Sequence, residues 1–531
     1  GYSGTNVHMI FEAAPPKSKS DEVPSPLHFV LSAKDAHALK SLANKYLSET
    51  DWQENSLTEI CFTLQNHRNN FDYKLSIVAN NKQAIIEGLT DFVQDIKSEK
   101  YAVSQPSLNR NKEVVFMFTG QGAQYFGMCK SYYDTFDIFK QTIDECDEMM
   151  KSALQISIKD ILWNDSIDKN LIHQTKYTQA ALFVVEYASA KLWMSFGVHA
   201  SALIGHSIGE IVALTIANAI DLKDAVQLVI ARAALMNSLP MHEGSMASVF
   251  CNEETLQPFL ENSNVNLAAV NSIKNCTISG KKEDVATFVA MLQEHKIKAV
   301  PLQVSHAFHS YLMEPIVEKF TIFAQQFSFK QPAITVVSNL TGKEITKADL
   351  SAAYFANHIR HAIQFAKGVD YLQKNNYEVY IEVGPNPVLI SLAKQSNTNS
   401  NALWLPSAKR EENDITYFHK TLQQLYCADI KINWSIFYLH KKINRVALPS
   451  YAWNQKVYWE NPVRQAIHFA HSSNTHTSNN KIEIHDSNYQ TASTNTQTIA
   501  TRETLLAYMQ IEAAKVLGLE AGQKVDINKP Y

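Results

Sequence analysis

The pentapeptide Gly205-His-Ser-Ile-Gly209 constrains the fold more than any other stretch of this sequence. Apolar residues at 202–204 precede it, and residues 210–219 follow it with the spacing of a helix. This order predicts a nucleophile elbow, in which a strand turns sharply into a helix and exposes Ser207 at the turn. The two glycines would permit the turn, because a Cβ at either position would meet the neighbouring strand or helix. At a helix N-terminus, unpaired N–H groups and the helix dipole can stabilise an oxyanion beside that serine.

Composition and charge narrow the class of protein. The chain has 531 residues, of which 45% are hydrophobic, which is enough for several domains with sizeable cores. Its net charge of −4 favours neither nucleic acid nor an anionic membrane surface as a partner, and no apolar run is long enough to span a bilayer. The six cysteines have no C-x-x-C or metal-ligand spacing, so we expect reduced thiols, no metal site and a cytoplasmic location.

Two segments precede the catalytic motifs. Residues 1–16 begin with a glycine-rich turn, continue as a short strand and end at prolines, so this strand has no sheet of its own to join. Residues 27–105 alternate strand-like and helix-like patterns and carry no chemical motif, which predicts a small α+β unit.

A second glycine-rich loop lies upstream of the elbow. Residues 113–118 form a buried-strand pattern that ends in Thr119-Gly-Gln-Gly-Ala-Gln124. At the end of a central strand such a loop lets backbone approach a substrate, and Gln121 could point its amide into the same space as Ser207. A phosphate-binding loop is the alternative, but the Lys-Ser/Thr ending of a Walker motif is missing.

Arg232 lies in a helical stretch, residues 224–236, whose other members are nearly all apolar or small. A buried arginine requires an anionic partner, because an unpaired and desolvated charge costs several kcal/mol. That partner is either a carboxylate of the protein, in a structural salt bridge, or a substrate carboxylate held by two hydrogen bonds. The sequence alone does not decide between them.

The pattern changes at residues 240–304, where short strands alternate with two helices in the order βαββαβ. This order predicts a ferredoxin-like insertion. Val304-Ser-His-Ala-Phe-His-Ser310 follows, and either His306 or His309 could be the base that activates Ser207. Their spacing leaves both open.

The C-terminal part returns to helix and strand over residues 311–405. Residues 463–500 are rich in Ser, Thr, Asn and His, which is typical of a flexible linker. Residues 501–519 predict an amphipathic helix.

Taken together, these motifs resemble those of the malonyl/acyl-CoA:acyl-carrier-protein transacylase family, in the form found inside modular polyketide synthases. The motifs that agree in order are Gly120-Gln-Gly-Ala-Gln124, Gly205-His-Ser-Ile-Gly209, Arg232, Asn271, His306-Ala-Phe-His-Ser310, Ser338-Asn-Leu-Thr-Gly342 and Glu382-Val-Gly-Pro385. Ala362 and Asn386 depart from the family's usual proline and histidine. The resemblance implies an α/β fold with a parallel-sheet, hydrolase-like core, an inserted ferredoxin-like α+β subdomain and a small α+β linker domain in front.

The resemblance also divides the chain into domains. It implies a ketosynthase C-terminal tail at 1–16, a ketosynthase–acyltransferase linker domain at 17–110, an acyltransferase domain at 111–405 with its subdomain at about 240–304, a post-acyltransferase linker at 406–462, a flexible linker at 463–500 and the truncated start of an acyl carrier protein at 501–531.

Carried over residue by residue, the resemblance makes Ser207 the nucleophile and His309 its general base and acid. A backbone carbonyl at His358 would orient that histidine. The backbone N–H of Ile208 and the side chain of Gln121 would form the oxyanion hole.

The resemblance further implies a substrate. Arg232 would hold the malonyl carboxylate, and His306 and Phe308, in a His-Ala-Phe-His run that resembles malonyl-selective relatives, would set selectivity. The implied reaction transfers malonyl from malonyl-CoA through a malonyl-serine to the phosphopantetheine thiol of an acyl carrier protein, with no metal or cofactor bound by the acyltransferase itself. The implied partners are malonyl-CoA, that carrier protein, the neighbouring ketosynthase and other synthase domains.

Two alternative hypotheses stay open. A serine hydrolase or thioesterase shares the elbow, but it should place an Asp or Glu before its last histidine and does not require Gln121 or Arg232. A non-catalytic scaffold between synthase domains would account for the linkers, but not for a complete set of Ser207, His309 and Arg232.

Overall fold

The computed structural model describes residues 8–12, 18–104, 112–241, 243–396, 401–410, 412, 414–454 and 510. The chain divides into two units, residues 1–454 and 455–531, and every helix and strand named below belongs to the first. The predicted flexible linker at 463–500 lies outside the described residues, as does the carrier-protein start at 501–531 with its predicted helix, apart from Gln510. Of the predicted tail at 1–16, the described residues 8–12 form no strand.

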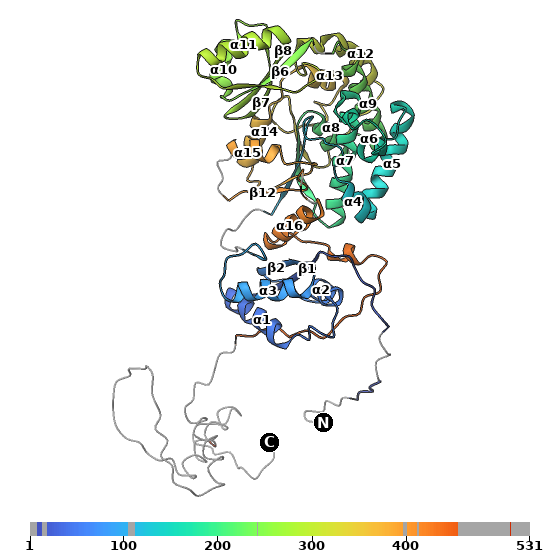
Figure 1. The fold of residues 1–531 in the computed structure, drawn as a ribbon, viewed down its shortest axis with the longest axis vertical. Coiled ribbons are helices and arrows are strands. Elements are labelled where there is room, and N and C mark those ends of the chain that lie inside the picture. Colours follow the sequence, from blue (N-terminus) through green and yellow to red (C-terminus); the bar gives the residue numbers. More distant parts are fainter. Residues whose placement is uncertain are drawn as a thin grey trace, which may run out of the picture. The chain divides into compact units, whose positions relative to one another are not determined.

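A five-stranded parallel sheet forms the centre of the catalytic region (Figure 1). Its order is β10-β5-β4-β11-β12, and its strands are β4 (Val114–Phe118), β5 (Ala200–Gly205), β10 (Thr335–Val337), β11 (Val379–Glu382) and β12 (Leu403–Pro406). All five residues of β4 are buried, as expected for a parallel strand that helices cover on both faces. The carboxyl ends of β4 and β5 lie side by side, so the loop at 119–124 and the elbow begin at the same edge of the sheet.

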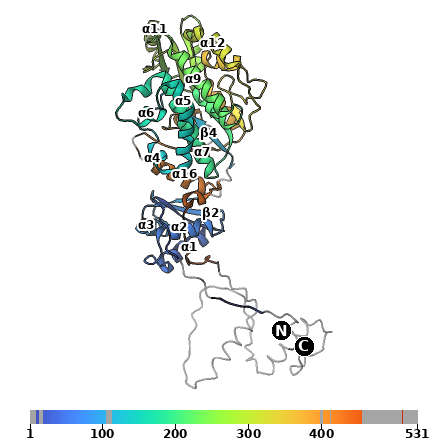
Figure 2. The same ribbon diagram turned by 90° about the vertical axis from the view of Figure 1, so that its right-hand side faces the viewer.

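Successive side chains of β4 enter two different cores. Phe116 and Phe118 belong to a core with α5 (Asp137–Leu154), α7 (Thr175–Ser195), α8 (Ile208–Ile216) and α9 (Leu222–Asn237), whereas Val115 and Met117 pack with α14 (Phe365–Lys374) and α15 (Leu389–Ser396). The first core also takes side chains from α4 (Lys130–Thr135), α6 (Ile158–Trp163), α12 (Glu314–Ala324) and α13 (Ala352–Arg360). Figure 2 shows α5, α7 and α9 beside one another. The α/β core with a parallel sheet is therefore confirmed.

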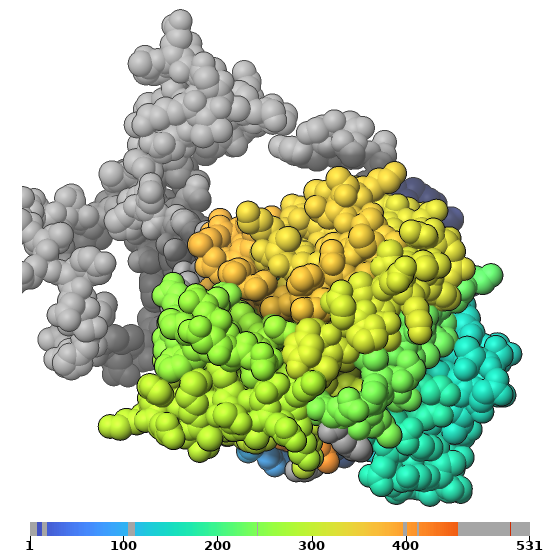
Figure 3. Space-filling model, turned by 90° about the horizontal axis from the view of Figure 1, so that it is seen from above, coloured from blue at the N-terminus to red at the C-terminus, as the bar shows by residue number. Residues whose placement is uncertain are grey.

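The predicted ferredoxin-like insertion is present as a separate sheet with its own core. Its elements are β6 (Gly244–Val249), α10 (Glu253–Leu260), β7 (Asn266–Ser272), β8 (Asn275–Lys281), α11 (Lys282–Glu294) and β9 (Ala299–Leu302). The strands pair antiparallel in the order β7-β8-β6-β9, which is the βαββαβ arrangement expected from the sequence. Figure 3 shows this subdomain in yellow-green beside the yellow and orange surface of the segment that carries α12 to α15.

The N-terminal α+β unit is a three-stranded antiparallel sheet with three helices. It contains β1 (Leu27–Ala33), α1 (Ala36–Glu49), α2 (Leu57–Asn66), β2 (Tyr73–Ala79), α3 (Lys82–Val93) and β3 (Ala102–Val103). Ser56 and Glu59 form a capping box that fixes the start of α2. Two-residue β3 was not predicted, because so short a strand has no alternating pattern.

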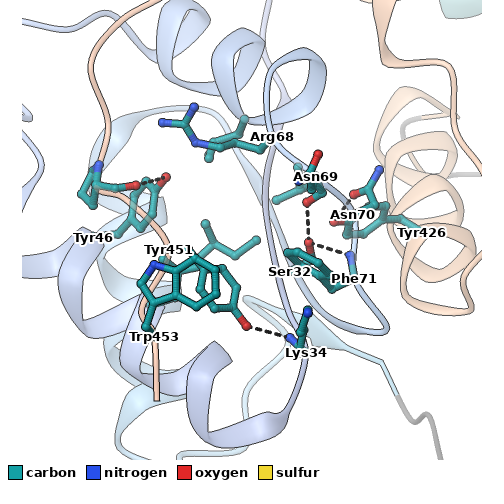
Figure 4. A pocket seen from close by; sticks show the side chains of 15 residues that line it. Ser32, Lys34, Tyr46, Arg68, Asn69, Asn70, Phe71, Tyr426, Tyr451 and Trp453 are labelled. Carbon is teal, nitrogen blue, oxygen red and sulfur yellow. Dashed lines mark hydrogen bonds between the residues drawn. The ribbon is translucent and has the colours of Figure 1, made fainter. Parts of the chain in front are cut away.

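The chain returns to this N-terminal unit after the catalytic sheet. Helix α16 (Asp414–Cys427) packs on β2, where the side-chain amide of Gln423 donates to the carbonyl of Ser76 at 2.7 Å. Farther along, the Tyr451 hydroxyl accepts the backbone N–H of Lys34 at 3.0 Å, beside a cavity of about 180 Å³ (Figure 4). Residues 414–454 therefore contact both regions, because α16 also packs on the catalytic region, where the Phe418 ring lies 4.5 Å from that of Trp193 in α7.

The two elbow glycines sit where the chain has no room for a side chain. A Cβ on Gly205 would lie 2.1 Å from the backbone N of Glu210, and one on Gly209 would lie 2.3 Å from the carbonyl oxygen of Phe118 in β4. Between them Ser207 has φ 53° and ψ −114°, a conformation that non-glycine residues rarely adopt. The steric reason predicted for these glycines is confirmed.

We expect Gly209→Ala to lower the free energy of unfolding by about 3 kcal/mol or more, because the added methyl group meets the backbone of the central strand. Chemical denaturation followed by circular dichroism measures this loss. Gly280→Ala is the matched control, because its Cβ would have its nearest neighbour at 3.4 Å. Equal losses in the two variants would contradict this account of the elbow.

Candidate active site

Ser207 and His309 meet at the carboxyl edge of the parallel sheet. Ser207 follows β5, and His309 lies in the loop between β9 and the short 3₁₀ turn at Tyr311–Met313. The Ser207 hydroxyl lies 3.1 Å from Nε2 of His309, within reach for proton transfer. His309, like Ser207, has a positive φ, of 56°. This geometry favours His309 over His306 as the base.

The orientation of His309 comes from a main-chain carbonyl. Its Nδ1 lies 3.0 Å from the carbonyl oxygen of His361 and therefore donates to it, which leaves Nε2 as the acceptor that faces Ser207. The expected carbonyl at His358 is thus corrected to His361, just beyond the end of α13, where a carbonyl has no partner within the helix. The His358 carbonyl also raises the pKa of His309, by less.

His306 and Phe308 occupy different places. Phe308 lines the cavity that contains Ser207. His306 is buried behind it, with Nε2 3.0 Å from the carbonyl oxygen of Leu239 and its ring 5.9 Å from that of Phe308. Any effect of His306 on selectivity would therefore act through the position of Phe308.

Arg232 extends from α9 toward Ser207. The residue is 1% exposed, and its Nη1 donates to Oε1 of Gln179 at 2.6 Å while its Nη2 donates to Oγ of Ser207 at 3.0 Å. Burial lowers its pKa to about 10, and the more distant Glu210 opposes that decrease. No carboxylate of the described residues forms an ion pair with Arg232, and its Nε has no hydrogen-bond partner among them. The structural salt bridge that the sequence left open is absent from this part of the chain.

The predicted oxyanion donors lie on the two elements that follow β4 and β5. Gln121 lines the cavity, and its Oε1 accepts from Nε2 of Gln179 at 3.1 Å. Ile208 is the first residue of α8, so its backbone N–H is one of the groups that have no acceptor within the helix. Glu186 fixes the first loop, because its Oε1 accepts the backbone N–H of Thr119 at 2.9 Å.

Three polar residues that support this site were not predicted from the sequence. Asn339 accepts the Ser207 N–H through Oδ1 at 2.7 Å and donates through Nδ2 to the Gly205 carbonyl at 2.6 Å. The buried carboxylate of Glu210 in turn accepts the N–H of Asn339. Gln179 is the third. Asn339 lies in a motif that was noted without a role, and Gln179 is a polar residue in an otherwise largely apolar helix, which was the available signal.

The site opens into a cavity of about 710 Å³ between the parallel sheet and the subdomain. The subdomain contributes Ser248, Asn271, Asn275 and Thr277, which hydrogen-bond to one another, and Oδ1 of Asn271 accepts from Nε2 of His206 at 2.9 Å. Among the described residues, no group of three or more His, Cys, Asp or Glu side chains is arranged to hold a metal. The same described part contains no helix with both the length and the hydropathy that crossing a membrane requires.

Comparison with known proteins shows the family to which the chain belongs. Residues 115–431 match the family described as acyl transferase domain, and residues 28–89 match the family described as CurL-like, PKS C-terminal. The chain is 31% identical over 475 residues to the phenolphthiocerol synthesis polyketide synthase type I Pks15/1 of Mycobacterium marinum, which covers 87% of this chain and 22% of that protein. It is 30% identical over 488 residues to the polyketide synthase GfsA of Streptomyces halstedii, covering 86% and 6%. The chain thus spans less than a quarter of the length of these relatives.

A solved structure is similar to this chain in both sequence and fold. The acyltransferase domain from the second module of the salinomycin polyketide synthase is 30% identical, with a TM-score of 0.65 over 77% of this chain and 95% of that one. Fold and site define an acyltransferase with a serine at its elbow. The chain belongs to the acyl transferase domain family, in the form that type I polyketide synthases carry.

The pH dependence of acylation should report the surroundings of His309. Burial, followed by the Arg232 charge and His206, lowers the pKa of His309 to about 3. A histidine is a competent base only when neutral, so activity is lost as the pH falls through this low value rather than near the ordinary value of about 6.5. We expect the rate of acylation by p-nitrophenyl acetate, plotted against pH, to show no decrease from histidine protonation between about pH 5 and 8.

Arg232→Met should raise the pH at which protonation of His309 abolishes activity, because the variant removes a positive charge that disfavours that protonation. The uncharged ester avoids any need for a carboxylate clamp. A decrease in the wild-type rate near pH 6.5, or identical profiles for the two proteins, would contradict the assignment.

Proposed function

We propose that this chain transfers a malonyl group from malonyl-CoA to the phosphopantetheine thiol of an acyl carrier protein, as the extender-loading step of a modular polyketide synthase. The observation that supports malonyl as the substrate is the position of Arg232. Its guanidinium is buried, contacts neutral acceptors, and lies 3.0 Å from the nucleophile oxygen. A carboxylate two bonds from the reacting carbonyl carbon, as in malonyl, would reach such a cation while Ser207 attacks.

In the proposed mechanism, His309 takes the Ser207 proton as the serine oxygen attacks the thioester carbonyl. The backbone N–H of Ile208 and the Gln121 amide stabilise the oxyanion of the tetrahedral intermediate. The C–S bond then breaks, and His309 returns its proton to the departing thiolate of coenzyme A. The carrier's thiol repeats these steps in reverse on the malonyl-serine, and no metal or bound cofactor takes part.

The hydrolase alternative is less well supported. A hydrolase triad orients its histidine with a carboxylate, whereas here Nδ1 of His309 donates to the His361 carbonyl. Fixing the malonyl carboxylate on Arg232 would also place the acyl group in the space through which water would otherwise reach the ester. The scaffold alternative does not account for the Ser207–His309 contact.

We propose further that residues 111–405 form the acyltransferase domain, that 17–110 and 406–462 form its linkers, and that 1–16 and 501–531 belong to a ketosynthase and a carrier protein. The neighbouring synthase domains would be its protein partners. All six cysteines are free thiols, which is typical of a reducing compartment such as the cytoplasm.

Intact-protein mass after brief exposure to malonyl-CoA tests the reaction. We expect a malonyl adduct that is absent from Ser207→Ala and passes to an added carrier protein, because the acyl-serine should transfer to a thiol faster than to water. No adduct with steady release of malonate would support the hydrolase. No adduct and no turnover would support the scaffold.

Replacing Arg232 by alanine should lower kcat/KM for malonyl transfer about 100-fold, because hydrogen bonds to a charged group are lost. Acetyl transfer should be kept or increased. Parallel rate measurements with malonyl-CoA and acetyl-CoA give this ratio. Arg68→Ala, in the N-terminal unit and outside the cavity that contains Ser207, is the matched control and should leave this ratio unchanged. An unchanged ratio in Arg232→Ala would refute the clamp.

A further inference from the structure

Gln179 is a fully buried amide at the meeting point of two parts of the site. It lies on α7, with an exposed fraction of 0%. Its Oε1 accepts from Nη1 of Arg232 at 2.6 Å, and its Nε2 donates to Oε1 of Gln121 at 3.1 Å and to Sδ of Met236 at 3.1 Å. One side chain therefore bridges the carboxylate clamp and the oxyanion hole.

The chemistry of these groups fixes the direction of both hydrogen bonds in the series Arg232–Gln179–Gln121. A guanidinium can only donate, so the Gln179 atom that faces Arg232 must be the oxygen. The Gln179 nitrogen then faces Gln121, whose facing atom must in turn be its oxygen. This leaves Nε2 of Gln121 as the end of that amide available to the cavity, and a nitrogen there can donate to an oxyanion whereas an oxygen would repel it.

We propose that Gln179 is a positioning residue, which transmits the hydrogen-bond polarity of Arg232 to Gln121 and so keeps the Gln121 N–H directed at the reacting carbonyl. The proposal rests on the proposed function, because it assigns Gln121 to the oxyanion hole. It adds that the clamp and the oxyanion hole are linked: the arginine that binds the substrate carboxylate also determines which end of the Gln121 amide faces the substrate.

Helix α7 is a suitable support for this role. Seven residues after Gln179, and so on the same side of the helix, Glu186 holds the backbone N–H of Thr119 at 2.9 Å. The helix thereby fixes both the backbone of the loop and the side-chain amide that the loop carries. Every residue from Gln179 to Glu186 is buried, so this part of the helix can shift little relative to the sheet.

Two substitutions at Gln179 separate polarity from packing. In Gln179→Glu, both oxygens can accept from Arg232, but neither can donate to Gln121, whose amide must turn its Nε2 toward the new carboxylate. In Gln179→Met, shape is nearly kept and neither orientation of Gln121 is imposed. We expect Gln179→Glu to lower kcat about 100-fold, as loss of one oxyanion donor does, and Gln179→Met to lower it no more than about 10-fold.

The rates are to be measured with acetyl-CoA as well as malonyl-CoA, using the 531-residue chain. Both donors form the same oxyanion, so the effect through Gln121 should appear with both, whereas an effect through the Arg232 clamp should appear with malonyl alone. A wild-type chain that transfers acetyl but not malonyl would refute the proposed substrate and still allow the Gln179 comparison.

A double variant tests whether Gln179 acts through Gln121. If it does, Gln121→Ala with Gln179→Glu should have the acetyl rate of Gln121→Ala alone, because the donor is already gone. Gln65→Glu is the control for burying a carboxylate, since Gln65 also donates to a carbonyl, of His28, and accepts from a hydroxyl, of Tyr438, in the N-terminal unit. It should affect stability without lowering kcat.

Equal losses in Gln179→Glu and Gln179→Met, or losses that multiply in the double variant, would overturn the proposal. Should Gln179→Glu fail to fold, Gln121→Glu replaces it, because that variant keeps the acceptor for Gln179 and removes the donor facing the cavity. The proposal then requires Gln121→Glu to lose as much kcat as Gln121→Ala, and a smaller loss would refute it.

Discussion

The buried positive charge of Arg232 is the constraint on which the arrangement of the site depends. A desolvated guanidinium is costly unless it is satisfied, yet its direct acceptors here are an amide and a hydroxyl rather than a carboxylate. Glu210 attracts it from farther away and is committed to the N–H of Asn339. A direct carboxylate partner would have neutralised the charge permanently. Neutral acceptors leave it available to an anionic ligand, and the same charge helps to keep the nearby His309 unprotonated.

Backbone strain at Ser207 and His309 is accompanied by hydrogen bonds that support both residues. Ser207 and His309 both have a positive φ, and each is held by hydrogen bonds to its surroundings. Asn339 spans the elbow from the Ser207 N–H to the Gly205 carbonyl, and the His361 carbonyl holds the imidazole. A backbone conformation that is unfavourable in isolation persists when neighbouring groups determine it this closely. The catalytic geometry is therefore a property of the surrounding scaffold as much as of the two residues.

Much of this structure could be predicted from local patterns in the sequence. The elbow, the parallel core and the βαββαβ insertion follow from periodicity and from glycines whose steric role the structure confirms. The partners of Arg232 could not be derived this way, because Gln179 lies 53 residues away in sequence and the contact depends on how α7 packs against α9. The choice between His306 and His309 also needed three-dimensional geometry. The carbonyl that orients His309 was misplaced at His358, because the end of α13 decides which carbonyl is free, and helix ends are poorly marked in a sequence.

The return of residues 414–454 to the N-terminal unit has a consequence for protein engineering. The catalytic sheet is enclosed in sequence between two segments that pack on each other, with Gln423 bonded to Ser76 and Tyr438 to Gln65. A domain exchange that replaced the catalytic sheet together with α16, but kept β2, would pack the α16 of one protein against the β2 of another. A cut just before α16 would also divide a packed contact, because Phe418 of α16 lies against Trp193 of α7 and Thr421 donates to the carbonyl of Pro406. An exchange of the catalytic sheet should therefore carry both flanking segments with it.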